Sequence, residues 1–399
     1  MERASGAITW PKRFLAAGVR AGIKEQGEDV ALIYSEMPAS AAGVFTANIV
    51  RAAPVLVSQL RVPRATARAV IVNSGNANAC TGEQGLQDAR AMTAQTARLL
   101  EIAEEDVLVA STGVIGKRLP MDRVSAGIEE AVRSLSRDGG PSAARAIMTT
   151  DTRPKEASAE VSIGGSKVRI GGIAKGAGMI CPNVATMLAF ITTDAAVAPE
   201  MLQAALSNAA ERSFNCLTVD GDSSTNDTVI VLANGAAGNP RIERRDRDWE
   251  ELADALEFVS VSLAKQIAKD GEGATKMIEI TVRGAKSFQD ARQIARTVAN
   301  SPLVKTAMFG CDANWGRVLA AAGRAGVDFD PSAVSLFFGT TPVVRHGEPV
   351  DFSQAEMHEL LRGSEVNVLL EIGSGPGSAA VWTCDFSYDY VRINAEYHT

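Results

Sequence analysis

The sequence predicts a mixed α/β protein of the α+β type, with helices and strands interspersed along the whole chain. Several segments repeat apolar residues with the helical period, whereas others are short apolar runs typical of strands. The chain also has no internal repeat, low-complexity tract or long polar linker. Composition therefore indicates no domain boundary and no repetitive architecture.

Three segments are predicted to be helices. Apolar residues fall on one helical face between Val124 and Leu135, and again between Leu252 and Ile267. Pro199 suits the first turn of a third helix, because the N–H that proline lacks has no partner at that position.

Strands are predicted where apolar residues run together in shorter stretches. The hairpin signal is clearest between Val161 and Ile170, where Gly164 and Gly165 separate two β runs. The other predicted strands are Ala69 to Val72, Val107 to Ala110, Met187 to Ile191, Thr228 to Leu232 and Met277 to Val282.

Composition and charge favour a compact protein that acts on a small molecule. Of 399 residues, 46% are hydrophobic and 22% charged, and the formal net charge is -7. Nucleic-acid binding needs a clustered excess of Lys and Arg, so we expect no nucleic-acid partner. The most membrane-like stretch, Ala177 to Ile191, contains Pro182 and Asn183 and is shorter than the roughly 20 residues that span a bilayer. We expect no membrane partner, and a buried strand entered from a loop in this stretch.

The cysteines and the N-terminus favour the cytoplasm. The apolar run from Phe14 to Val19 is closed by Arg20 and is too short for the core of an export signal. No C-x-x-C pair occurs, so neither a disulfide framework nor a zinc site is predicted. The five cysteines, expected to be reduced thiols, are Cys80, Cys181, Cys216, Cys311 and Cys384.

Several familiar motifs are incomplete. The run from Asp220 to Asp227 begins like a calcium loop but lacks its central glycine and closing glutamate. The segment from Gly373 to Gly377 leads into another strand-like run, which favours a tight turn over a dinucleotide-binding loop. A histidine-based nucleophile has few candidates, because the only histidines are His346, His358 and His398. We expect no metal.

The segment from Lys175 to Asp194 contains the best candidate for a nucleophile. Glycines and a Pro-Asn pair precede Ala185 and Thr186 at the start of an apolar run, a composition equally compatible with a loop that enters a core strand. A threonine hydroxyl can act as a nucleophile when the residue is N-terminal and its own α-amine, with a pKa near ~7.7–8.0, serves as base. Cleavage before Thr186, through an N-to-O acyl shift at a strained turn, would create that amine.

Ordered sequence blocks cover almost the whole chain. They are ITWPKRFLAAG near the start, NSGNANACTG (Asn73 to Gly82), STGVIGK (Ser111 to Lys117), MTTDT (Met148 to Thr152), KGAGMICPNVATML (Lys175 to Leu188), DGDSSTNDT (Asp220 to Thr228), GCDANWGR (Gly310 to Arg317) and the terminal DYVRINAEYHT. In these blocks the chain resembles the glutamate N-acetyltransferase family, also called ornithine acetyltransferases, of arginine biosynthesis. The resemblance implies a sandwich of stacked sheets flanked by helices, with a smaller C-terminal lobe. It also implies self-cleavage into an α chain, residues 1–185, and a β chain, residues 186–399.

The resemblance implies an acyltransferase that moves acetyl from N-acetylornithine to glutamate through an ester on Thr186. Thr112 and Gly113 would form the oxyanion hole, where one donor is typically worth ~2.7–4 kcal/mol. The family needs no bound cofactor, and use of acetyl-CoA as a second donor stays open. The expected assembly is a heterotetramer of two α and two β chains.

The resemblance also implies a set of substrate contacts, at Thr149, Lys175, Thr186, Glu272, Asn394 and Thr399. As isolated charges, Lys175 and Glu272 would be interpreted as solvated surface groups, but their motif positions favour contacts with a zwitterionic amino acid. The GSGPG turn lacks the acidic residue that we expect in relatives, and Cys181 is interpreted as a buried, inert thiol because no basic motif lies near it.

Two other functions stay open. One is a self-processing aminopeptidase or amidohydrolase of similar fold, in which water replaces glutamate as the acceptor. The terminal NAEYHT match disfavours it. The other is an uncleaved metabolite-binding protein without catalysis. Electrophoresis under denaturing conditions would separate a cleaved chain from an intact one.

Overall fold

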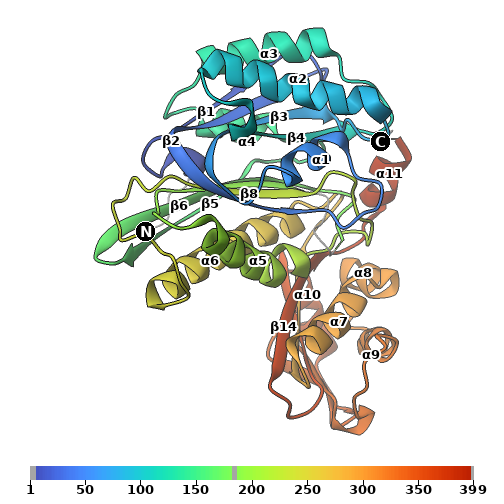
Figure 1. Cartoon of the computed structure of the whole chain (residues 1–399). Coiled ribbons are helices and arrows are strands. Elements are labelled where there is room, and N and C mark those ends of the chain that lie inside the picture. The colour runs from blue at the N-terminus through green and yellow to red at the C-terminus, as the bar shows by residue number, and fades with distance from the viewer. Residues whose placement is uncertain (1–5, 182–186, 397–399) are drawn as a thin grey trace.

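The computed structural model describes residues 6–181 and 187–396, which form a large body and a smaller C-terminal lobe (Figure 1). The larger sheet has the strand order β4-β3-β2-β8-β7-β6-β5, with β1 paired to β2. Its strands are β1 (Phe14–Val19), β2 (Val30–Phe45), β3 (Arg64–Asn76), β4 (Val107–Val114), β5 (Lys155–Ile163), β6 (Ser166–Lys175), β7 (Leu188–Thr193) and β8 (Thr228–Ala233).

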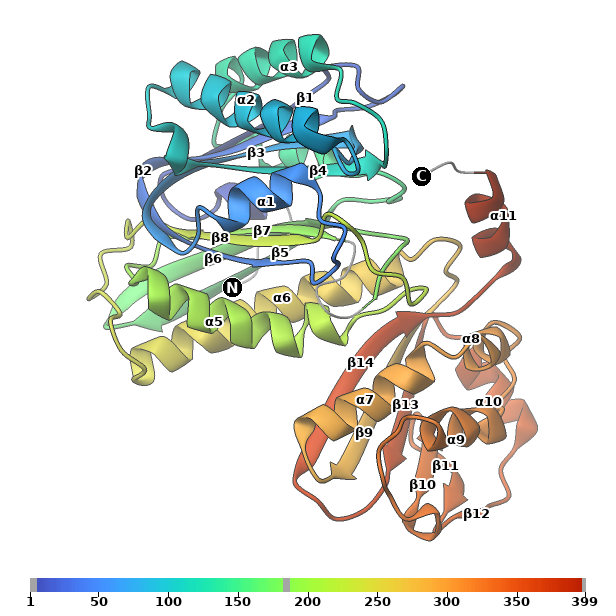
Figure 2. The same ribbon diagram turned by 45° about the vertical axis from the view of Figure 1, so that its right-hand side comes forward.

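The long strand β2 divides this sheet into two stacked layers. Residues 30–34 of β2 pair with β1 and β3. Residues 40–45 pair with β8, although Ala39 and Ala41 still pair with β3, and the β2–β3 register is irregular between the two halves. Irregular register of this kind bends a strand. Figure 2 shows β1 to β4 lying above β5 to β8. A buried apolar cluster joins the layers, with Ile33 from the upper one and Phe190 from the lower one.

Helices cover the outer faces of both layers (Figures 1 and 2). On the upper layer, α2 (Gly82–Leu100) and α3 (Met121–Arg133) bury Met92 and Ile128 against the sheet. On the lower layer, α5 (Pro199–Arg212) and α6 (Arg247–Lys269) bury apolar residues in the same way. Two short helices, α1 (Ala53–Gln59) and α4 (Gly140–Ala146), complete this body. The order is therefore helix, sheet, sheet, helix, which confirms the predicted mixed α/β fold with stacked sheets flanked by helices.

The smaller lobe contains a second sheet, with the order β12-β11-β10-β13-β9-β14. Its strands are β9 (Met277–Ala285), β10 (Ser335–Phe338), β11 (Thr341–Arg345), β12 (Glu348–Pro349), β13 (Glu365–Glu371) and β14 (Gly377–Cys384). The helices of the lobe are α7 (Phe288–Ala299), α8 (Pro302–Phe309), α9 (Trp315–Gly323) and α10 (Gln354–Leu361). After β14 the chain returns to the large body as α11 (Tyr388–Glu396), on the side where β4 ends (Figure 2).

The predicted elements are present in the structure, with small differences at their ends. Pro199 begins α5, and the predicted hairpin is the β5–β6 pair, in which Gly164 and Gly165 have φ angles of 53° and 80°. Positive φ at both turn residues is what a two-residue hairpin turn of type I′ requires. The predicted helical face extended to Leu135, but α3 ends at Arg133.

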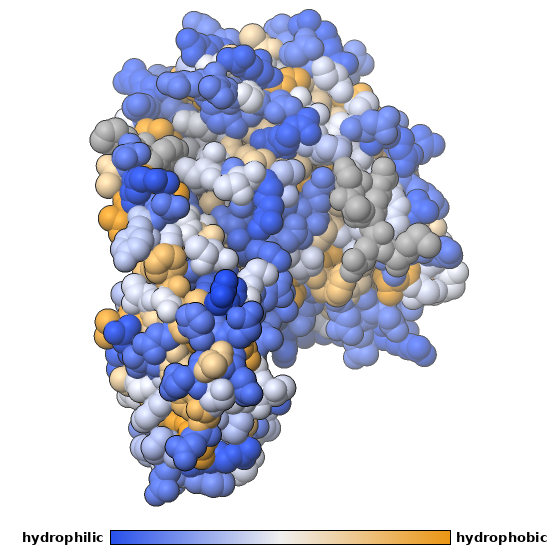
Figure 3. Space-filling view, turned by 180° about the vertical axis from the view of Figure 1, so that it is seen from behind, coloured by the Kyte–Doolittle hydropathy of each residue, from blue (hydrophilic) through white to orange (hydrophobic). Residues whose placement is uncertain are grey.

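Within the described ranges, no helix combines the length and the apolar character that crossing a membrane requires. Figure 3 shows hydrophilic residues over most of one face of the molecule.

Candidate active site

A cavity of about 480 Å³ lies where the ends of several strands meet α11. Its walls come from the end of β4, the end of β6, the loop that precedes β8, the segment between α6 and β9, and α11 itself. The described lining residues are Ala77, Thr112, Gly113, Ile115, Thr149, Thr150, Lys175, Gly178, Met179, Asp220, Asp222, Ser223, Ser224, Thr225, Asn226, Glu272, Tyr390 and Asn394.

Thr112 and Gly113 lie at the end of β4, beside the parallel strand β3. Gly113 has a φ of 131°, and a Cβ atom there would lie 2.3 Å from the backbone carbon of Gly75. Only glycine therefore allows the two strands to approach so closely at the cavity wall. The amide of Asn226 donates hydrogen bonds to the Ala77 and Ser111 carbonyls, at 2.6 and 2.8 Å. These bonds join the loop before β8 to the end of β4.

Lys175 is the last residue of β6 and is 4% exposed. Burial lowers the pKa of Lys175 below its ordinary value, whereas the carboxylates of Asp151, Asp227 and Glu272 oppose this shift. Lys175 pairs with Leu188, the first residue of β7. Lys175 therefore places a buried amino group, which holds its proton less tightly than usual, at the point where the chain enters β7.

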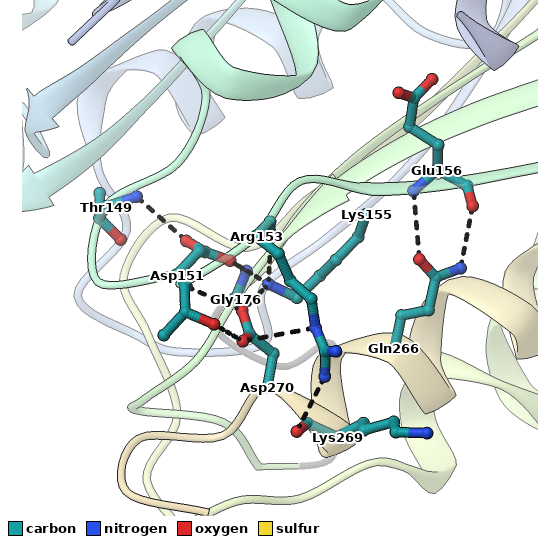
Figure 4. A network of polar contacts seen from close by, with 10 residues as sticks. Thr149, Asp151, Arg153, Lys155, Glu156, Gly176, Gln266, Lys269 and Asp270 are labelled. Carbon is teal, nitrogen blue, oxygen red and sulfur yellow. Dashed lines mark hydrogen bonds and ion pairs between the residues drawn. The ribbon is translucent and has the colours of Figure 1, made fainter. Parts of the chain in front are cut away.

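Asp151 positions two of the predicted substrate-contacting segments (Figure 4). Its Oδ1 atom accepts hydrogen bonds from the Gly176 N–H at 2.7 Å and from Lys155 Nζ at 2.5 Å, and its Oδ2 accepts from the Thr149 N–H at 3.0 Å. Burial alone would raise the pKa of Asp151, but the ammonium groups of Lys155 and Lys175 outweigh it and lower that pKa to about 2. The carboxylate is therefore ionised over the whole physiological range.

Lys155 extends this network to the end of α6. Its Nζ lies 2.6 Å from the Oδ2 of Asp270, and both side chains are almost completely buried. Asp270 also accepts hydrogen bonds from the N–H and the hydroxyl of Thr152. Because Asp270 precedes Glu272 by two residues, the network connects the segment around Asp151 with the segment that carries Glu272.

Glu272 is held on two sides. Its N–H donates to the Ala177 carbonyl at 2.9 Å, and the side-chain amide of Asn394 on α11 donates to its Oε2 at 2.9 Å. A Cβ atom on Gly178 would lie 2.3 Å from Glu272 Oε2, so glycine at this position leaves room for the carboxylate. The glycine-rich segment that follows Lys175 therefore packs directly against a predicted substrate contact.

Asp220 holds the end of the same segment. Its carboxylate accepts hydrogen bonds from the N–H groups of Met179 and Ile180, at 2.6 and 2.9 Å. Burial raises the pKa of Asp220 to about 6, although three backbone hydrogen bonds oppose the shift. The start of the DGDSSTNDT block suggested only an incomplete calcium loop, and its contact with the Lys175 segment was not predicted.

Among the residues that the structure describes, no three His, Cys, Asp or Glu side chains form a cluster suited to a metal ion.

The predicted site residues that the structure describes all line this one cavity. They are Thr112, Gly113, Thr149, Lys175, Glu272 and Asn394. Ala185, Thr186 and Thr399 lie outside the described residues. Sequence reasoning did not find Asp220, Asp222 or Tyr390 as cavity residues. The only available signal was that each lies in a block that carried the family resemblance.

All five cysteines are free of disulfide bonds. Cys181 is only partly buried, so the prediction of a buried thiol is wrong in this respect. Burial still raises the pKa of Cys181. A raised pKa favours the thiol over the nucleophilic thiolate.

Hydroxyl groups, a buried lysine and several carboxylates in one cavity of a mixed α/β protein suit an enzyme that acts on small, charged molecules. The family model for the ArgJ family matches residues 15–399. The arginine biosynthesis bifunctional protein ArgJ of Symbiobacterium thermophilum is 55% identical over 402 residues, and the alignment covers 100% of both chains. The chain belongs to the ArgJ family.

Other relatives agree with this assignment. The protein of the same name from Caldanaerobacter subterraneus is 49% identical, again over 100% of both chains. A crystal structure of the arginine biosynthesis bifunctional protein from Bacillus halodurans is 42% identical, with a TM-score of 0.50, and the match covers 52% of this chain and 97% of that chain. The expectation of an acetyltransferase of arginine biosynthesis is thereby confirmed.

Proposed function

We propose that this enzyme transfers acetyl from N-acetylornithine to glutamate through an acetyl ester on Thr186, after cleavage between Ala185 and Thr186. The observation that carries the proposal is the convergence of Thr112, Gly113 and Lys175 on one cavity, at the strand end where β7 begins. Thr186 precedes the first residue of β7, Leu188, by two positions. This short separation in sequence supports a nucleophile at the same end of the sheet.

The chemistry requires two acyl transfers. The hydroxyl oxygen of Thr186 attacks the acetyl carbonyl carbon, the carbon–nitrogen bond breaks, and the hydroxyl proton leaves on the amine of ornithine. The amine of glutamate then attacks the ester, the carbon–oxygen bond breaks, and Thr186 regains its hydroxyl proton. In both steps the α-amine of Thr186 relays the proton, and donors at Thr112 and Gly113 stabilise the oxyanion.

The charged groups of the cavity fit the common part of both substrates. An α-carboxylate needs a cationic partner and an ammonium needs a carboxylate, and Lys175 and Glu272 offer these two charges in one cavity. Thr149 and Asn394 line the same cavity and add polar contacts. Thr399, five residues after Asn394, would contribute from the chain end.

Cleavage would leave residues 1–185 as the α chain and residues 186–399 as the β chain. The Bacillus halodurans chain supports this, because nearly all of it matches only about half of the present chain. For the assembly we propose two α and two β chains. Exposed apolar side chains on α8 and α11, which an interface would cover, support association; they are Leu303, Tyr388 and Val391.

We extend the proposal to a second donor and to a cellular location. The relatives are called bifunctional, which supports acetyl-CoA as an additional acetyl donor for glutamate. Free cysteines support a reducing compartment, and we propose the cytoplasm.

Two measurements test the proposal. Purified protein should separate into two chains under denaturing conditions, and Thr186→Ala should remain intact; cleavage of that variant at the same bond would contradict self-processing. Initial rates against N-acetylornithine at several glutamate concentrations should give the parallel double-reciprocal lines of ping-pong kinetics. Intersecting lines would contradict the ester intermediate, and rapid ornithine release without glutamate would indicate the amidohydrolase instead.

A further inference from the structure

Lys24 lies in the loop between β1 and β2, and this loop is built around the buried carboxylate of Asp29. One Asp29 oxygen accepts a hydrogen bond from the Ala21 N–H at 2.6 Å, and the other accepts from the N–H groups of Ile23 and Lys24, at 2.6 and 3.0 Å. The Asp29 carbonyl also accepts from the Ser74 N–H on β3 at 2.9 Å. Hydrogen bonds to an ionised group are strong, so the backbone at Lys24 is held firmly beside the end of β3.

The ammonium group of Lys24 reaches the segment that follows α4. Its Nζ donates to the Met148 carbonyl at 2.8 Å, across 124 positions of the sequence. That carbonyl belongs to the same peptide group as the Thr149 N–H, which donates to Asp151 Oδ2 at 3.0 Å (Figure 4). A peptide group is planar, and here a charged side chain holds each of its polar ends. The two contacts together fix the backbone that presents Thr149 to the cavity.

The methylene stem of Lys24 packs against the opposite part of the same wall. A Cβ atom on Gly75 would lie 2.7 Å from Lys24 Cγ, and a Cβ atom on Gly113 would lie 2.3 Å from the backbone carbon of Gly75. Lys24 therefore packs on Gly75, and Gly75 packs on Gly113, which lines the cavity. Without the stem, the end of β3 would have space into which it could relax.

The charge of Lys24 also belongs to the electrostatic surroundings of the cavity. Burial lowers the pKa of Lys24 below its ordinary value, while the carboxylates of Asp29, Asp151 and Glu28 oppose the shift and the ammonium of Lys175 adds to it. Partial burial of an ammonium group costs solvation free energy, which an exposed lysine in this loop would not lose. The position of Lys24 is therefore explained by what its two ends contact.

We propose that Lys24 is a positioning residue for two parts of the cavity wall: its ammonium group fixes the peptide that precedes Thr149, and its stem holds Gly75 against Gly113. This inference rests on the proposed function, in which Thr149 contacts the substrate and Gly113 belongs to the oxyanion hole. Lys24 itself does not line the cavity. Because one contact serves binding and the other serves the chemical step, the two ends of this side chain should have separable kinetic effects.

Two substitutions separate these effects. Lys24→Met keeps most of the stem and removes the ammonium group, so KM for N-acetylornithine should rise about 5- to 10-fold while kcat stays within about twofold of wild type. The Kd of ornithine from calorimetry, which needs no turnover, should rise by a similar factor. Lys24→Ala also removes the stem and should in addition lower kcat by about 10-fold or more. If Lys24→Ala does not fold, the result with Lys24→Met decides the inference.

Arg20→Met provides the matched control in the same loop. Arg20 is exposed, donates to the Glu25 carbonyl at 2.8 Å and lies outside the cavity lining. Arg20→Met should keep the wild-type kcat, KM and Kd. Equal changes in Arg20→Met and Lys24→Met would show that the loop acts as a whole, which would overturn the inference.

Two further results would overturn the inference. One is a Lys24→Met enzyme with the wild-type KM and Kd, and the other is a loss of kcat that is as large in Lys24→Met as in Lys24→Ala. Neither result affects the proposed function as long as the wild type gives parallel double-reciprocal lines and Thr186→Ala remains intact. Intersecting lines or cleavage of Thr186→Ala would instead contradict the proposed function.

Discussion

Lys155 Nζ lies 2.5 Å from Asp151 Oδ1, and the two side chains are 1% and 0% exposed. A charged pair so deeply buried is expensive to desolvate, and hydrophobic residues of similar size often stabilise a fold as well or better. This pair has a second role, because Asp151 also accepts hydrogen bonds from Thr149 and Gly176. The buried pair therefore also fixes the backbone of the segments around Thr149 and Gly176 at the cavity.

Asp151→Asn should weaken both stability and substrate binding. Removal of one carboxylate from a buried network leaves Lys155 with Asp270 alone, and breaking such a pair costs about 3 kcal/mol or more. The free energy of unfolding from urea titrations should fall by roughly that amount, and KM for both amino acids should rise. The exposed control Asp138→Asn should stay within about 0.5 kcal/mol of wild type. An unchanged KM in a folded Asp151→Asn enzyme would contradict the positioning role.

Asp220 should make the stability of the protein increase as the pH falls below 7. The folded pKa of about 6 lies above the ordinary value of 3.8, so the folded state binds the proton more tightly than the unfolded state. The stability of the wild type relative to Asp220→Asn should therefore increase as pH falls from 7 to 4, by roughly 2 to 3 kcal/mol. Urea titrations of both proteins across this range measure the difference. A difference that stays constant with pH would show that Asp220 is ionised normally.

Thr112→Ala should slow the chemical step. If its hydroxyl donates to the developing oxyanion, its loss should lower kcat by about 100-fold or more and leave KM nearly unchanged. Thr112→Ser restores the hydroxyl and should recover most of the rate. Thr306 is an exposed threonine on α8, and its replacement by alanine provides the control. An equal loss in the serine and alanine variants would indicate that Thr112 acts through packing and not through its hydroxyl.

Local signals were sufficient to predict many elements of the fold. Pro199 and the Gly164-Gly165 pair act within a few residues, and the structure places both as expected. The path of β2 was not predictable in this way. Only its second half pairs with β8, and that choice depends on contacts far along the chain.

In the candidate site, too, some residues were predictable from local motifs and others depend on long-range contacts. Motifs indicated Lys175 and Glu272, but nothing near Lys155 in sequence indicates that it is buried between two carboxylates, one of them 115 residues away. Likewise, Asp227 is one aspartate among several in a polar run until the sheet register places it beside Met187. Burial of a charge is decided by tertiary contacts, which composition does not reveal.

Asn394→Ala should weaken substrate binding without lowering the stability of the fold. None of the residues of α11 is buried, so truncation of one side chain there should barely change the free energy of unfolding. The Asn394 amide nevertheless donates to Glu272 at 2.9 Å, across a separation of 122 residues. Without that donor, the Glu272 carboxylate loses a partner that fixes its rotamer at the cavity wall, so KM should rise several-fold while the melting temperature stays constant.

Arg392→Ala on the same helix is the matched control, because Arg392 pairs only with Asp389 among the described ion pairs and lies outside the cavity lining. Equal KM changes in the two variants would mean that α11 acts as a whole and not through Asn394. A change confined to Asn394→Ala would assign the effect to its contact with Glu272.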